Sequence, residues 1–132
     1  MENLQRMIDY VNEIPDFNMH NGIVLTEVRE NYASCRAKLT GDSLNPQGIV
    51  HGGLLFAMCD FAGGYSVCSD SRPLVTQTSS FSFLRSCGDG EYLWAEGIPV
   101  KVGKRTAVVD SMVYDDKNTL LAKGTFTYFY VD

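Results

Sequence analysis

Clustered metal-binding residues are missing from this sequence. Only two of its 132 residues are histidines, and no C-x-x-C pair occurs. Structural zinc sites and redox pairs need clustered ligands, so we predict that the chain holds no metal. The cysteines are instead expected to be free thiols in or near the core. They are Cys35, Cys59, Cys68 and Cys87.

Long apolar runs and an excess of basic charge are also missing. No run approaches the ~20 apolar residues of a membrane span, and the first residues, MENLQRMIDYV, lack the basic-then-apolar pattern of a signal peptide. We therefore expect a cytoplasmic protein with no membrane partner. The net charge of −5 argues against nucleic acid as a partner. A polyanionic ligand would need a local basic cluster.

The length and the residue pattern predict one domain, residues 1–132. Hydrophobic residues make up 45% of the chain and charged residues 20%, which suits a normal globular core. In residues 2–13 the apolar side chains recur at helical spacing, so an amphipathic helix is predicted there. Residues 22–40 alternate partly between apolar and polar, which predicts two strands with a turn at Asn31.

Residues 49–70 form the most apolar stretch, and its length favours a helix over a strand. A helix that is apolar on all sides is expected to be buried on all sides. Gly63 and Gly64 within it suggest close contact with another helix or chain. Short turns between consecutive strands then predict an antiparallel sheet that curves around this helix in an α+β fold. The four predicted strands after the helix are 74–85, 91–102, 105–114 and 119–131.

A glycine pair stands at the predicted start of this helix, within NPQGIVHGG, residues 45–53. Gly52 and Gly53 disfavour a helix by up to about 1 kcal/mol each relative to alanine. In return they let a ligand approach backbone N–H groups that have no intrahelical partner. Such amides suit an oxyanion hole for acyl transfer. Plainer interpretations stay open: His51 as an ordinary helix-start residue, Asn45 as a turn residue and the glycines as a means of close packing.

Asp60 follows more than two turns into the helix and is the only charged residue from Gly52 to Ser69. A lone carboxylate in an apolar helix costs roughly several kcal/mol unless it is paired or functional. Asp60 is therefore a candidate site residue. It could act as a general base on water or attack a carbonyl carbon itself. The alternative is a structural acid bonded to a neighbouring backbone or subunit.

Residues 45–60, NPQGIVHGGLLFAMCD, resemble the motif of hotdog-fold acyl-CoA thioesterases of the phenylacetic-acid-degradation type, relatives of thioesterase superfamily member 2. The resemblance runs from about residue 20 to the end of the chain. It implies the hotdog fold, a curved antiparallel sheet wrapped around one long central helix. It also implies that the chain hydrolyses the thioester of a coenzyme A derivative to the free acid and CoA. No cofactor is implied, because coenzyme A is part of the substrate.

The resemblance also assigns roles within the motif. Asp60 matches the catalytic carboxylate of the family. Gly52 matches the glycine whose N–H polarises the thioester carbonyl, with Asn45 assisting. His51 matches the motif histidine that helps hold the substrate or the loop. These four residues are the expected catalytic centre, together with a hydroxyl residue on the strand after the helix.

Further residues are expected to bind the substrate or water. Thr76 falls where the family often has a hydroxyl residue that positions the water, and Thr78 takes its place if the register differs by two. Gly53 and Phe83 are expected at the substrate, with Phe81 and Phe83 favouring aromatic or medium-sized acyl groups. The segment that resembles the CoA-binding segment of the family is Lys101, Val102, Gly103, Lys104, Arg105 and Thr106. Three cations around a glycine also suit phosphate groups, and Arg85 could add to them.

The resemblance implies a homodimer in which Asp60 of one subunit and Gly52 of the other share a site. Such dimers commonly pair into homotetramers, and unpaired sheet edges support association. Two other functions stay open. One is a non-catalytic module that binds acyl-CoA, and the other is the chemistry of a related hydratase or dehydratase.

Overall fold

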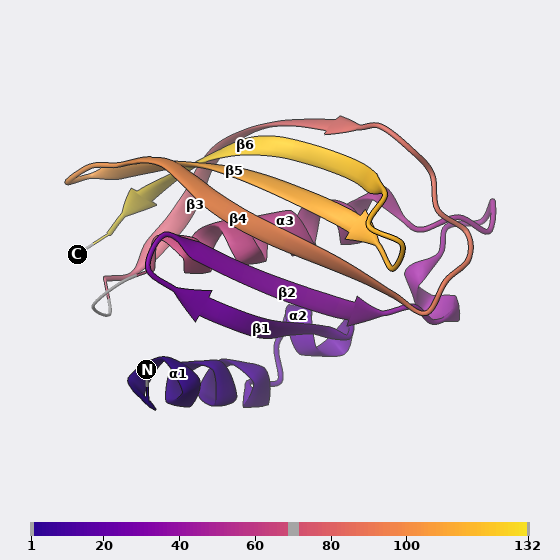
Figure 1. Ribbon diagram of the computed structural model, residues 1–132, viewed down its shortest axis with the longest axis horizontal. Helices are drawn as coiled ribbons and strands as arrows, with labels where there is room; N and C mark the ends of the chain where they lie inside the picture. The colour runs from indigo at the N-terminus through magenta and orange to yellow at the C-terminus, as the bar shows by residue number, and fades with distance from the viewer. Residues whose placement is uncertain (1, 69–71, 132) are drawn as a thin grey trace.

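The computed structural model describes residues 2–68 and 72–131 (Figure 1). Its secondary structure confirms the predicted N-terminal helix, the central helix and the six strands. The elements are α1 (Glu2–Glu13), α2 (Phe17–His20), β1 (Ile23–Arg29), β2 (Tyr32–Lys38), the 3-10 helix η1 (Gly41–Ser43), α3 (Gly52–Ser66), β3 (Leu74–Phe83), β4 (Tyr92–Val102), β5 (Thr106–Asp115) and β6 (Leu120–Tyr130).

Helix α3 is shorter than the apolar stretch that predicts it. It begins at Gly52 and ends at Ser66, and positions 69 and 70 of the stretch lie outside the described residues. Helix α2 has no counterpart among the predicted elements. The Asp16 carboxylate caps it by accepting the Met19 N–H at 3.1 Å. The turn at Asn31 is confirmed, since this residue adopts a positive φ of 60°.

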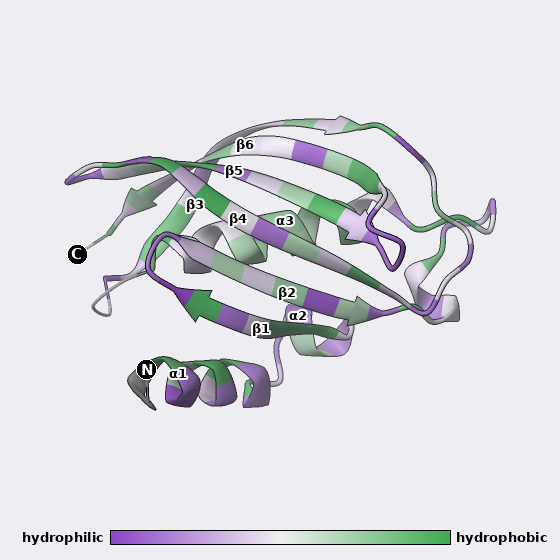
Figure 2. Cartoon of the chain, viewed as in Figure 1, coloured by the Kyte–Doolittle hydropathy of each residue, from purple (hydrophilic) through white to green (hydrophobic). Residues whose placement is uncertain are grey.

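The six strands form one antiparallel sheet in the order β1-β2-β4-β5-β6-β3. Strand β3 follows α3 in the chain but lies at the edge of the sheet, beyond the last strand β6. The sheet curves in front of α3 (Figure 1), and apolar and polar residues alternate along several of its strands (Figure 2). The predicted α+β architecture, a sheet wrapped around one helix, is confirmed.

One face of α3 packs against the sheet, and its other face is only partly covered. The expectation that α3 is buried on all sides is therefore wrong for a single chain. Phe56, Ala57, Asp60 and Phe61 stay partly exposed on the uncovered face. The buried residues of α3 are Leu54, Leu55, Met58, Cys59, Ala62, Gly63, Gly64 and Ser66.

The glycine pair inside α3 contacts the sheet of its own chain, so among the described residues its close contact is with strands and not with another helix. A Cβ atom on Gly97 of β4 would lie 2.7 Å from the Ala62 carbonyl oxygen and from Gly63 Cα. A Cβ atom on Gly63 would in turn meet the hydroxyls of Tyr128 and Ser111. The helix can lie this close to β4 and β5 only because glycines occupy both sides of the crossing.

Helix α1 covers the β1–β2 side of the sheet and one end of α3. Ile8 and Val11 lie in a second apolar cluster with Leu25 and Val28, against which Phe61 and Tyr65 of α3 also pack. Across the described ranges, no helix is long and apolar enough to cross a membrane.

The four cysteines are free thiols, as predicted. Cys35, Cys59 and Cys87 are buried, and Cys68 is half-buried. Burial raises the pKa of all four thiols, so they stay protonated and unreactive near neutral pH.

Candidate active site

Asp60 lines a pocket along the partly exposed face of α3. This pocket has a volume of about 740 Å³. The Thr76 hydroxyl donates a hydrogen bond of 2.7 Å to Asp60 Oδ1, which leaves the second carboxylate oxygen without this partner. Aromatic side chains supply much of the remaining lining: Phe17, Phe56, Phe61, Tyr65 and Tyr128.

A bulge in β3 places Thr76 beside Asp60. Across β3 and β6, Thr76 pairs with Tyr128 and Thr78 pairs with Thr127, so Gln77 is an extra residue. Phe83 contacts Gly52 of α3, and strict alternation over seven residues would point Thr76 to the opposite face. The extra residue shifts the alternation by one position, so Thr76 points to the same face of the strand as Phe83. Thr76 is therefore the hydroxyl residue at Asp60, and the alternative, Thr78, is not.

His51 and Gly53 together form the cap of α3. His51 Nδ1 accepts the Gly53 N–H at 2.8 Å, which satisfies one of the free amides at the helix start. The N–H of Gly52 differs, because it donates no hydrogen bond to any residue that the structure describes. Gly52 thus offers the free amide that the sequence pattern predicts, and His51 holds the helix start.

Asn45 shares a smaller pocket with Gly52. This pocket, of about 300 Å³, also includes Phe83 and Arg85. Asn45 Oδ1 accepts the N–H groups of Gln47 at 3.0 Å and Ile49 at 3.3 Å. The oxygen therefore shapes the loop, as a turn residue does, and the amide NH₂ group is the part of Asn45 that remains for a ligand.

The single chain does not bring all of the expected residues together. Asp60 follows Gly52 by eight positions, which corresponds to about 12 Å along a helix axis. The Asp60 pocket and the pocket of Gly52 and Asn45 are separate openings. Phe83 lines the Gly52 pocket rather than the Asp60 pocket, whereas Gly53 reaches the latter.

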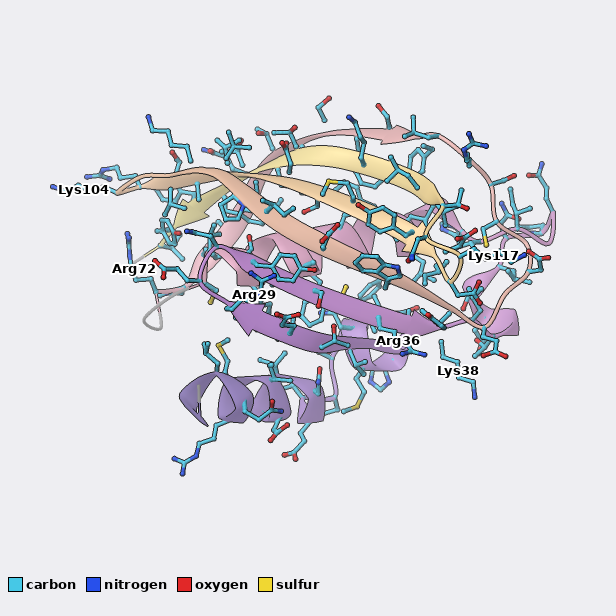
Figure 3. The ribbon with its side chains drawn as sticks, viewed as in Figure 1. Arg29, Arg36, Lys38, Arg72, Lys104 and Lys117 are labelled. Atoms are coloured by element: carbon cyan, nitrogen blue, oxygen red, sulfur yellow. The ribbon has the colours of Figure 1, made fainter. Side chains whose placement is uncertain are left out.

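The predicted CoA-binding segment is the turn between β4 and β5, which protrudes at the end of the molecule opposite the start of α3 (Figure 1). Gly103 N–H closes the turn by donating to the Thr106 carbonyl at 2.8 Å. Lys101, Lys104 and Arg105 are exposed there. Arg72 lies at the same end as Lys104 (Figure 3) and donates to the Lys104 carbonyl at 2.6 Å. None of the segment's residues lines the pocket of Asp60 or that of Gly52.

More than half of the chain, residues 47–122, matches the family model of the Thioesterase superfamily. The chain belongs to this superfamily. A putative esterase of Archaeoglobus fulgidus is 30% identical over 76% of this chain and 67% of its own. The acyl-coenzyme A thioesterase PaaI of Escherichia coli is 29% identical over 76% of this chain and 72% of its own.

Solved structures show the same architecture. The E. coli PaaI structure has a TM-score of 0.88 at 23% identity, covering 98% of this chain and 95% of that one. A Streptococcus mutans protein bound to acetyl CoA has a TM-score of 0.79 at 31% identity, covering 90% of this chain and 94% of that one. The thioesterase described here is thus a thioester hydrolase with a PaaI-like hotdog fold.

Several residues at the pocket of this thioesterase are absent from the predicted set. The Tyr128 hydroxyl donates to the Asp60 carbonyl at 2.9 Å, and Phe17 reaches the pocket from α2. Tyr128 could have been found, because a tyrosine on the buried face of a strand needs a partner for its hydroxyl. Phe17 gave no such signal, since it stands in a segment without clear periodicity.

The cap formed by His51 predicts a pair of stability effects. His51→Ala removes the acceptor for Gly53 N–H and is expected to lower the free energy of unfolding by about 1 kcal/mol. His51→Asn keeps a good N-cap acceptor and is expected to stay close to wild type. Thermal unfolding of the three proteins measures the difference. Equal melting temperatures for wild type and His51→Ala would contradict the capping role.

Proposed function

We propose that this thioesterase hydrolyses the thioester of an acyl-CoA to the free acid and CoA, with Asp60 as its catalytic carboxylate. The observation that carries the proposal is the Thr76–Asp60 hydrogen bond in the lining of a pocket rich in aromatic side chains. An apolar pocket with a few convergent polar groups is the usual form of a small-molecule site. The acetyl CoA bound to the S. mutans relative and the name of E. coli PaaI support CoA thioesters as the substrate class.

The complete site requires a second copy of the chain. Asp60 lies about 12 Å along α3 from the free amide of its own Gly52, which is too far for both to act on one carbonyl group. Strand β3 is an edge of the sheet, and nearly all of its residues are exposed. An edge strand presents unpaired N–H and C=O groups to a partner strand. Pairing of β3 with β3 of a second copy would form a twofold dimer.

The positions along β3 predict the register of this pairing. Thr76 lies at Asp60, and Phe83 lies at Gly52 of the same chain. An antiparallel register that sets Thr76 opposite Phe83 of the second copy brings each Asp60 toward the other copy's Gly52. The pair at the centre is then Ser79 opposite Ser80, two small residues on exposed positions of the strand.

In this arrangement the Gly52 N–H of one copy donates to the thioester oxygen, where negative charge develops. Asp60 of the other copy takes a proton from water, whose oxygen bonds to the carbonyl carbon. The C–S bond then breaks, and the CoA sulfur leaves with a proton. Alternatively, Asp60 itself bonds to the carbonyl carbon, and water cleaves the resulting anhydride. Both routes give the free acid and CoA, and Thr76 orients Asp60 in either.

The β4–β5 turn of the copy that supplies Asp60 is proposed to hold the CoA phosphates. The twofold axis reverses the direction of α3, so the Gly52 end of one copy approaches the end of the other that carries this turn. Lys101, Lys104, Arg105 and Arg72 gather there, and a thioesterase with a net charge of −5 needs such a local cluster for a polyanion. Val102, Gly103 and Thr106 complete the turn.

A thiol-release assay tests the proposed function. The purified protein is expected to release CoA thiol from acyl-CoA, and a panel of short-chain, long-chain and aromatic acyl-CoAs ranks its preference. An enoyl-CoA in the same panel tests for hydration without thiol release. Binding of acyl-CoA without thiol release, measured in parallel by calorimetry, would show a binding module instead and would contradict the proposal.

A further inference from the structure

A buried tyrosine on β6 contacts the backbone of the proposed catalytic acid. The Tyr128 hydroxyl donates to the Asp60 carbonyl oxygen at 2.9 Å, and the Tyr128 side chain is only 1% exposed. We propose that Tyr128 is a positioning residue, which holds the turn of α3 that carries Asp60 so that the carboxylate meets Thr76 and the substrate. This inference builds on the proposed role of Asp60.

Tyr128 and Thr76 both donate hydrogen bonds to Asp60, one to its backbone and the other to its side chain. They are direct partners across β3 and β6. Thr76 bonds to the carboxylate of Asp60 at 2.7 Å, and Tyr128 bonds to its carbonyl at 2.9 Å. Two neighbouring strands therefore fix both the side chain and the backbone of Asp60. A rotation or shift of α3 would stretch at least one of these bonds.

The glycine at position 63 makes this contact possible. A Cβ atom on Gly63 would lie closer to the Tyr128 hydroxyl oxygen than any real contact allows, and 2.8 Å from Ser111 Oγ. An alanine there would push the tyrosine away from the Asp60 carbonyl. Gly63 thus leaves room both for the Tyr128–Asp60 hydrogen bond and for the close crossing of α3 with β4. Ser111 Oγ is also buried at this crossing and makes no hydrogen bond to any described residue.

The same strand carries a matched control. Tyr130 lies two residues after Tyr128, and its hydroxyl donates to the Val67 carbonyl at 2.8 Å, just past the end of α3. Both tyrosines are buried, and both bond a backbone carbonyl in or next to the same helix. They differ in the place they hold, since Val67 follows Asp60 by seven residues. A general loss of stability would affect both variants alike, and a loss of positioning would affect only one.

Tyr128→Phe and Tyr130→Phe are compared by kcat, KM and thermal unfolding. Each substitution removes one hydroxyl and is expected to lower the melting temperature to a similar extent. Tyr128→Phe is expected to lower kcat by about ten- to a hundredfold with little change in KM, because a small misplacement of a reacting group is costly. Tyr130→Phe is expected to keep the kcat of wild type. Equal kcat values for the two variants would overturn the inference.

A double-mutant cycle with Thr76 gives an independent measurement. If Tyr128 and Thr76 position the same residue, the effects of Tyr128→Phe and Thr76→Val on kcat are not additive. Additive effects would overturn the inference, even if each variant alone is slow. Its failure differs from failure of the proposed function. In the first case wild type is active and Asp60→Asn is not, whereas in the second case wild type releases no thiol.

Discussion

Asp60→Asn is expected to lower kcat by about 10²- to 10⁴-fold while the fold is retained. An amide neither takes a proton from water nor attacks a carbonyl carbon, and removal of a catalytic base costs about 10²- to 10⁴-fold. The substitution keeps the size of the side chain, and the amide oxygen can still accept the Thr76 hydroxyl, which lies 2.7 Å from Asp60 Oδ1. Steady-state thiol release measures the activity, and circular dichroism with thermal unfolding measures the fold.

Asp110→Asn is the control for this substitution. Asp110 Oδ1 accepts the hydroxyl of Thr125 at 2.9 Å, so both acids accept a hydrogen bond from the hydroxyl of a threonine that lies on a strand. Asp110 does not line the Asp60 pocket, and Asp110→Asn is expected to turn over substrate as wild type does. Near-normal turnover by Asp60→Asn would show that the carboxylate is structural, which is the alternative that the sequence alone leaves open.

The sequence predicts the fold well because the physical signals are strong and local. Alternation in β1, β4 and β5 is the direct result of one face that meets the interior and one that meets solvent. The long apolar run could bury itself only against such a sheet. The apolar sequence of α3 overstates its burial, because the face of the helix that points away from the sheet is only partly covered within one chain.

The details that position the site depend on features that leave little trace in residue types. The bulge at Gln77 decides which threonine meets Asp60, and no periodicity in TQTSSFSF reveals it. Gly63 suggests close contact, but only the sheet order shows that the contact is with Gly97 and Tyr128. The Asn45 side chain supports the loop by accepting hydrogen bonds from two backbone N–H groups. This role is common for an asparagine in a turn, so the residue type alone does not distinguish it from a ligand-binding role.

Gly52→Pro is expected to lower kcat by about 10²- to 10³-fold, as removal of one oxyanion-hole donor does. Proline removes the N–H and is tolerated at the first position of a helix, where that N–H has no intrahelical partner. The preceding residue, His51, already has the extended backbone that proline requires, with φ −65° and ψ 131°. The substitution therefore isolates the amide from the helix.

Gly52→Ala is the matched control, because it keeps the N–H. Both variants add a Cβ atom, which would lie 3.0 Å from Phe83 Cε1. The Phe83 side chain is 60% exposed and can shift, so Gly52→Ala is expected to lose only a small part of its activity. Equal losses in the two variants would assign the effect to crowding and not to the amide.

Mixed dimers test whether Asp60 and Gly52 of different copies share a site. Asp60→Asn and Gly52→Pro subunits are each expected to be inactive alone. When they are unfolded together and refolded as an equal mixture, half of the dimers contain both kinds. In each mixed dimer one site combines an intact Asp60 with an intact Gly52, so about a quarter of the wild-type activity is expected to return. A site built within one chain would regain none, because every chain in the mixture lacks one of the two groups.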